Sequence, residues 1–193
     1  MEPVFALSYS EYAAANMLAH YFKAKDGYSL FVPTSRQEKG IDLLLTKRRN
    51  DQLACLSFQV KSSRTYTPPP PKRQTTQRFT YYTWFNTFAV PERADFFLLF
   101  GLYPADQNRT KKVRSSWWNS LILAFSHAEM QEFIANVKTR GGKRDPMFGF
   151  GFDIPAQVAL TRGDSGRSLK DFSEFILPKK VSGIITALDE RLK

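Results

Sequence analysis

The chain has 193 residues and a formal net charge of +10, and 42% of its residues are hydrophobic, so we expect one domain over residues 1–193. The chain has one cysteine and two histidines, which excludes a disulfide framework and a thiolate zinc site. It also has no glycine-rich phosphate loop and no G-x-S-x-G motif. Any chemistry must therefore depend on carboxylates, amides and amines. No run approaches the roughly 20 apolar residues of a membrane span, and the N-terminus does not resemble a signal peptide, so we expect a cytoplasmic protein without a membrane partner.

The first predicted element is an amphipathic helix over about residues 8–25. Ser8 and Glu11 have the spacing of a capping box, and Ala14 and Leu18 recur at helical spacing. Gly27 ends this helix, and a short extended segment follows to residue 33.

Two apolar runs, at 41–46 and 53–60, predict an antiparallel hairpin. Asn50 and Asp51 favour a two-residue turn, because asparagine tolerates a positive φ. Arg49 would then pair with Gln52.

The rest of the chain predicts more strands and two further helices. Residues 67–73 include four consecutive prolines and should form an exposed loop. Residues 79–90 are aromatic-rich and extended, and 94–103 and 120–125 are buried strands. A second capping box at Ser126 begins a helix to about residue 139, 147–154 alternates like a strand, and 179–192 forms the last helix. This order predicts an α/β domain with a central mixed sheet flanked by helices.

Four polar residues are predicted to approach one another around the hairpin. In its expected register Asp42 lies opposite Gln59, and the period of two puts Lys61 on the same face as Gln59. Glu11 shares the helix face of Ala14, which must pack on the core. A buried carboxylate is costly unless it is paired, hydrogen-bonded or bound to metal.

These residues resemble the motif of the PD-(D/E)XK nuclease superfamily, which has a glutamate on the first helix, an aspartate opening one strand and (D/E/Q)-x-K on the next. G-I-D-L-L at 40–44 and F-Q-V-K at 58–61 are especially similar to Mrr-type restriction endonucleases and archaeal Holliday-junction resolvases. The founding motif has proline where this chain has Ile41. Gln59 supplies a neutral carbonyl oxygen in place of a carboxylate.

The resemblance implies a restriction-endonuclease-like fold and hydrolysis of DNA phosphodiester bonds with Mg²⁺ or Mn²⁺. The implied metal ligands are the side chains of Glu11, Asp42 and Gln59 and the backbone carbonyl of Val60. Lys61 would orient the attacking water and stabilise the charge of the transition state. A homodimer is expected if both strands are cut.

Each of these residues also has a structural explanation. Glu11 would complete the capping box with Ser8, Asp42 would accept turn hydrogen bonds, and Lys61 would be an exposed cation at a strand end. The alternative is a weakly active or inactive nucleic-acid-binding member of the same fold, left open by Gln59. The aromatic residues of 79–88 favour a core or an interface over base stacking.

The net charge favours nucleic acid, because each Lys or Arg contact with a polyanion releases bound counterions. No acidic residue occurs from 62 to 91. The candidate phosphate contacts are Arg64, Lys72, Arg73, Arg78, Lys111 and Lys112. Solvated loops are the alternative explanation of both groups of basic residues, the one at 64–78 and the one around Lys111 and Lys112. An interaction protein that uses the aromatic segment would show no salt-dependent DNA binding.

Overall fold

The computed structural model describes residues 9–33, 40–67, 79–104, 118–153, 157–164 and 169–193. These parts of the chain form an α/β fold in which helices cover a nine-stranded sheet. The helices are α1 (Tyr9–Tyr21), α2 (His127–Ala135) and α3 (Leu177–Glu190), with 3-10 turns η1 (Ala24–Asp26) and η2 (Ser173–Phe175). The strands are β1 (Tyr28–Phe31), β2 (Leu43–Arg49), β3 (Gln52–Tyr66), β4 (Tyr81–Asn86), β5 (Phe96–Pro104), β6 (Trp118–Ser126), β7 (Met147–Asp153), β8 (Gln157–Arg162) and β9 (Lys170–Asp171). None of the described helices is long and apolar enough to span a membrane.

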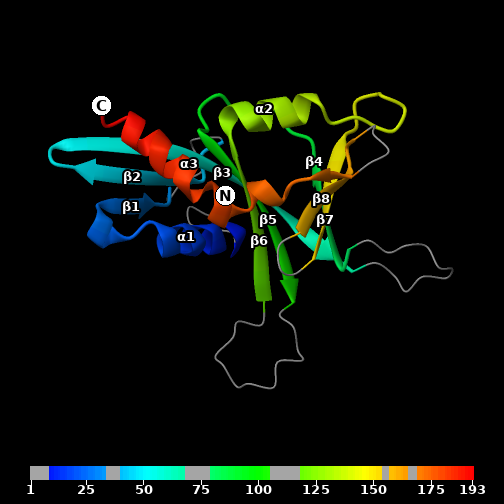
Figure 1. Cartoon of the computed structure of the whole chain (residues 1–193), viewed down its shortest axis with the longest axis horizontal. Helices are drawn as coiled ribbons and strands as arrows, with labels where there is room; N and C mark the ends of the chain where they lie inside the picture. The colour runs from blue at the N-terminus through cyan, green and yellow to red at the C-terminus, as the bar shows by residue number, and fades with distance from the viewer. Residues whose placement is uncertain (1–8, 34–39, 68–78, 105–117, 154–156, 165–168) are drawn as a thin grey trace, which may run out of the picture.

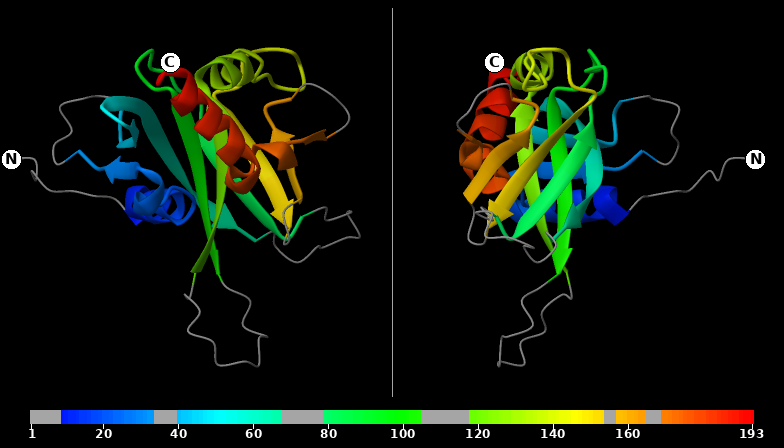
Figure 2. Two further views of the ribbon diagram at one scale, coloured as in Figure 1. Left: turned by 60° about the vertical axis from the view of Figure 1, so that its left-hand side comes forward. Right: turned by 90° about the vertical axis from the view of Figure 1, so that its right-hand side faces the viewer.

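The sheet branches at β3. Its strand order is β1-β2-β3-β4-β7-β8-β9, and β5, which pairs with β3 and β6, lies off this path. All pairs are antiparallel except β3 with β5, so the sheet is mixed, as predicted. In Figure 1 and in the left view of Figure 2, β1 and β2 lie on one side of β5 and β6, and β7 and β8 lie on the other.

β2 and β4 share one edge of β3 but use different parts of it. β2 pairs with the first half of β3, and β4 pairs with its last two residues. The Val60 N–H donates to Asp42 beside β2, and the Arg64 C=O accepts from the Thr83 hydroxyl of β4. Peptide groups of every second residue point to the same edge of a strand, so both contacts lie on the edge opposite β5. Between them, residues 60–63 form an edge with which no described strand pairs, here called the open edge.

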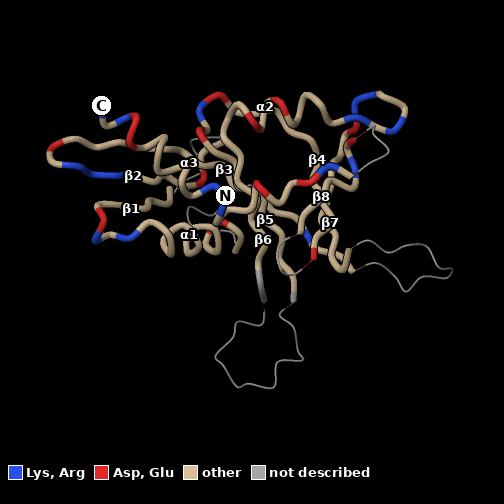
Figure 3. The backbone as a smooth tube through the Cα atoms, in the orientation of Figure 1, with Lys and Arg blue, Asp and Glu red and all other residues tan. Residues whose placement is uncertain are grey.

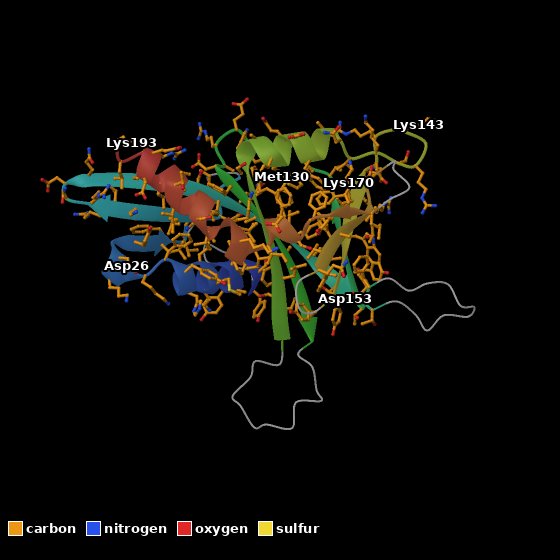
Figure 4. The ribbon with its side chains drawn as sticks, in the orientation of Figure 1. Asp26, Met130, Lys143, Asp153, Lys170 and Lys193 are labelled. Atoms are coloured by element: carbon orange, nitrogen blue, oxygen red, sulfur yellow. The ribbon has the colours of Figure 1, made fainter. Side chains whose placement is uncertain are left out.

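Two hydrophobic clusters lie on opposite faces of the sheet around β3 and β5. On one face, α1 and α3 pack against Leu56, Phe58 and Val60 of β3. On the other face, α2 packs with β5, β6 and the phenylalanine-rich β7. Met130 of α2, labelled in Figure 4, is fully buried on this second side. The side chains of β5 are thus divided between the two cores, whereas the buried apolar side chains of β3 all belong to the first.

The first two helices are shorter than predicted. α1 ends at Tyr21 rather than near residue 25, because the chain tightens into η1 before Gly27 closes the turn at a φ of 85°. α2 ends at Ala135 rather than near residue 139, and the chain then enters a β-bridge between Lys138 and Arg144.

The capping boxes and the last strands also differ in part from the prediction. The box at Ser126 is present, with Glu129 accepting the Ser126 N–H at 2.8 Å. Ser8, the first residue of the other box, lies outside the described residues. β8 and β9 are additional to the predicted strands. β9 has only two residues and β8 ends in Thr161 and Arg162, so neither has a clear alternating pattern.

Candidate active site

The β2–β3 hairpin has the predicted register. Its two-residue turn pairs Arg49 with Gln52, and the same register continues to the other end of β2. Asp42, one residue before β2, donates its N–H to the Phe58 C=O at 2.8 Å. The pairing of β2 with β3 ends at Leu43 and Phe58, and Asp42 lies just beyond it, where its bond to Phe58 departs from the regular ladder that would set it opposite Gln59. A slip of one residue would turn the apolar side chains of β2 away from their core, which is why this register is favoured.

The carboxylate of Asp42 turns toward the open edge. Its Oδ2 accepts the Val60 N–H at 2.7 Å, a short bond of the charge-assisted kind. The N–H and C=O of one strand residue point to the same edge, so the Val60 C=O points this way too. A carboxylate and a peptide carbonyl thus meet where the pairing with β2 stops.

Gln59 precedes Val60 in β3, and its amide lies beside Gly40, two residues before Asp42. Its side chain is 6% exposed, and its Oε1 is buried without a hydrogen-bond partner among the described residues. Leaving such an acceptor unsatisfied costs about 1–3 kcal/mol. Gly40, at a φ of 91°, passes so close that a Cβ there would lie 3.6 Å from Gln59 Nε2 and 2.8 Å from Pro91 Cβ. Only glycine fits this passage without strain.

Lys61 is half-buried beside the open edge. Its Nζ lies 5.2 Å from the centroid of the Phe88 ring, a cation–π distance. Phe88 in turn stacks on Phe97 of β5 at 6.1 Å. The ammonium is thus held on the face of β3 from which Gln59 also leaves.

Glu11 approaches from the other face. It lies half-buried in the first turn of α1, on the side of the buried Ala14 that was predicted. α1 packs on the face of β3 that carries Val60, whereas Gln59 and Lys61 leave the opposite face. The start of α1 and the end of β3 line a common pocket of about 590 Å³. The structure therefore joins Asp42 to Val60, next to Gln59 in β3, and only a ligand at the open edge could be reached from both faces.

A second pocket, of about 480 Å³, lies beside Lys61. It is formed by residues 61–63 of β3, the end of β4 and the segment that follows β4. Phe85 is a core residue, as predicted, but Trp84 is half-buried and lines this pocket. Sequence reasoning missed the pocket because it depends on β4 joining β3 only at its end. The enrichment in aromatic residues was the available signal.

The basic candidates are only partly described. Arg64 is exposed on β3. The other candidates, Lys72, Arg73, Arg78, Lys111 and Lys112, lie outside the described residues, as does most of the proline-rich segment. Figure 3 shows Lys and Arg along β2 and in the segment after α2, with acidic residues between them.

Other groups able to act as nucleophile or base have structural roles. His127 is the first residue of α2, and its Nδ1 lies 2.9 Å from the Ala94 carbonyl oxygen. Cys55 is half-buried in β3. Burial raises the pKa of its thiol, and the neighbouring Asp95 carboxylate raises it further. A thiol of this kind is a poor nucleophile at neutral pH.

No family model matches this chain, and neither a curated protein nor a solved structure does. The candidate site must therefore be judged on its own geometry. No three His, Cys, Asp or Glu side chains gather within the described ranges. The predicted ligand set has only two carboxylates and adds an amide oxygen and a peptide carbonyl.

Proposed function

We propose that the protein is a Mg²⁺-dependent nuclease of the restriction-endonuclease-like PD-(D/E)XK type, which hydrolyses DNA phosphodiester bonds. The observation that carries this proposal is the contact at the end of the hairpin, where the Asp42 carboxylate accepts the Val60 N–H, one residue after Gln59 in β3. The topology is compatible with it, since a helix precedes an antiparallel meander whose third strand has a parallel neighbour, β5.

The residues at the open edge fit a hard divalent cation. Asp42 offers a carboxylate, Val60 a peptide carbonyl and Gln59 a buried amide oxygen that no described residue satisfies. All are oxygen ligands, which Mg²⁺ prefers. Glu11, on α1, would have to reach such an ion around the open edge. When bound, the ion would lower the pKa of a water molecule and neutralise charge on the phosphate.

The side chains around this point have separate tasks. The Val60 N–H fixes the orientation of the Asp42 carboxylate. Lys61 brings a compact cation that would orient the attacking water and stabilise charge on the scissile phosphate. Its contact with Phe88 restricts the long side chain before substrate arrives. The formal charge of +10 would draw a polyanion to the surface.

Two substitutions test this proposal. Asp42→Asn retains an oxygen that can accept the Val60 N–H, and Lys61→Met retains the apolar part of the side chain. Each is expected to reduce Mg²⁺-dependent cleavage of plasmid DNA by about 100-fold or more, because charge that stabilises the transition state is lost. Binding of the same DNA in EDTA should change little in Asp42→Asn, and the thermal unfolding midpoint should change little in both variants.

Asp51→Asn, at the exposed turn of the hairpin, is the matched control and should cleave like the wild type. Wild-type rates from both Asp42→Asn and Lys61→Met would rule the nuclease out.

A second candidate is a nucleic-acid-binding protein of the same fold without catalysis, which the neutral Gln59 favours. Such a protein would bind DNA through basic residues alone and lose affinity as salt rises. Titration with Mg²⁺ at fixed ionic strength separates the two, since only the nuclease gains turnover.

A further inference from the structure

The pocket beside Lys61 is created by the branching of the sheet. β4 pairs with β3 only at Thr65 and Tyr66, and the Ser63 hydroxyl donates to the Trp84 carbonyl just before this pairing begins. Beyond that pairing, beside residues 61–63, β3 and β4 separate and leave the pocket of about 480 Å³. Its size falls within the range of roughly 300–1,000 Å³ that is usual for small-molecule sites.

One wall of the pocket is aromatic and partly exposed. Tyr66 is 45% exposed and its ring centroid lies 4.9 Å from that of Trp84. Tyr82, the cross-strand partner of Tyr66, continues the row with a ring 6.1 Å from Trp84 and nearly parallel to it, at 14°. Three neighbouring aromatic residues thus lie along the ends of β3 and β4.

Trp84 is held in one orientation. A Cβ on Gly149 of the neighbouring β7 would lie 2.2 Å from Cδ1 of Trp84, so the indole occupies the space where any other side chain would project. A ring fixed in this way loses little entropy when a planar group stacks near it. Trp84 is therefore a preorganised member of the row.

A polar and a cationic group border the aromatic wall. Asn86 lines the pocket with an exposed amide, which can both donate and accept hydrogen bonds. Lys61 lines the pocket at the end nearest Asp42. Stacking surfaces flanked by cations are the usual means of holding single-stranded nucleic acid.

We infer that this pocket receives an unpaired nucleobase, and that the substrate class is therefore single-stranded nucleic acid, or a strand with an unpaired base at the cleavage point. The inference rests on the proposed nuclease function for its location beside Lys61. A base within a duplex is stacked on both faces and hydrogen-bonded along its edge, so it cannot enter such a pocket without leaving the helix.

The test is a binding measurement without divalent metal. Fluorescein-labelled oligo-dT and a duplex of the same length are titrated with protein in EDTA, and anisotropy is recorded. The wild type should bind oligo-dT more tightly than the duplex. Tyr66→Ala and Trp84→Leu should weaken binding to oligo-dT by about tenfold, the order that loss of one stacking ring produces.

Two controls keep the result specific. Tyr66→Phe retains the ring and should bind oligo-dT within about twofold of the wild type. Tyr12→Ala removes a ring on α1 that is 55% exposed, somewhat more than Tyr66, and should have no effect. If Trp84→Leu does not fold, Tyr66→Ala decides, since Tyr66 is exposed at the end of its strand. Unchanged oligo-dT affinity in Tyr66→Ala, equal wild-type affinity for duplex and oligo-dT, or an equal loss in Tyr12→Ala would overturn the inference.

This experiment is independent of catalysis. Selective oligo-dT binding that depends on Tyr66, found in a protein that never cleaves, would uphold the pocket and reject the nuclease. Metal-dependent cleavage with no such binding would uphold the nuclease and reject the pocket.

Discussion

Gln59 is the residue at which the candidate site differs most from a carboxylate-rich metal centre. Its buried Oε1 can offer a metal ion a dipole but no charge. Gln59→Glu should therefore lower the Mg²⁺ concentration for half-maximal cleavage by about tenfold, which corresponds to about 1.4 kcal/mol of added attraction. Without Mg²⁺ the same variant should unfold at a lower temperature, because it buries an uncompensated charge. Cleavage and melting curves over a Mg²⁺ series measure both effects.

Gln52→Glu makes the same chemical change at an exposed position in β3 and should alter neither curve. An unchanged Mg²⁺ requirement in a folded Gln59→Glu protein would mean that this side chain does not face the ion. Gln59 also illustrates the limit of sequence reasoning at this scale. Alternation predicted the face on which it lies, but not that Gly40 passes beside its amide, because Gly40 comes from another segment.

The hairpin is the element that the sequence predicted best. A turn signal and two alternating runs agree on one register, so local preference and core packing select the same pairing. The extension of β3 to Tyr66 was harder to predict from the sequence, because residues 61–66 are mostly polar and have no apolar alternation. Helical spacing likewise put Glu11 on the inner side of α1. It contained no information on which face of the sheet α1 would cover, because that depends on long-range packing.

Asn50 tests how much the turn contributes to this element. It has a φ of 55°, and it is the only non-glycine residue with a positive φ among those described. Asn50→Val should destabilise the protein by about 1–2 kcal/mol, since a β-branched side chain crowds the backbone there. Asn50→Gly should be close to neutral. Urea unfolding measures both, and Asp51→Val at the neighbouring turn position is the control without a positive φ. A loss in Asp51→Val as large as that in Asn50→Val would show that the φ of Asn50 is not the cause.

At the scale of the whole molecule, Arg191, which follows α3, forms hydrogen bonds that link β3 and the start of β5, the parallel strand pair of the sheet. Arg191 donates Nη2 to Asp95 Oδ1 at 2.5 Å and Nη1 to the Cys55 carbonyl. Asp95 also accepts the Ser57 N–H at 2.8 Å, immediately before β5 begins beside β3. One guanidinium thus joins the chain end to both strands of this pair.

Arg191→Ala should therefore lower the free energy of unfolding by about 1 kcal/mol, a value kept small because the Arg191 side chain is 48% exposed and its ion pair is partly screened. Arg191→Lys should not restore the loss, because an ammonium cannot reproduce the two-pronged contact of the guanidinium. Lys193→Ala, two residues further on and also exposed, should match the wild type in the same urea titration. If Arg191→Lys were as stable as the wild type, charge alone would account for the contact. The two-pronged guanidinium contact that links β3 to the start of β5 would then add no stability beyond that of the charge.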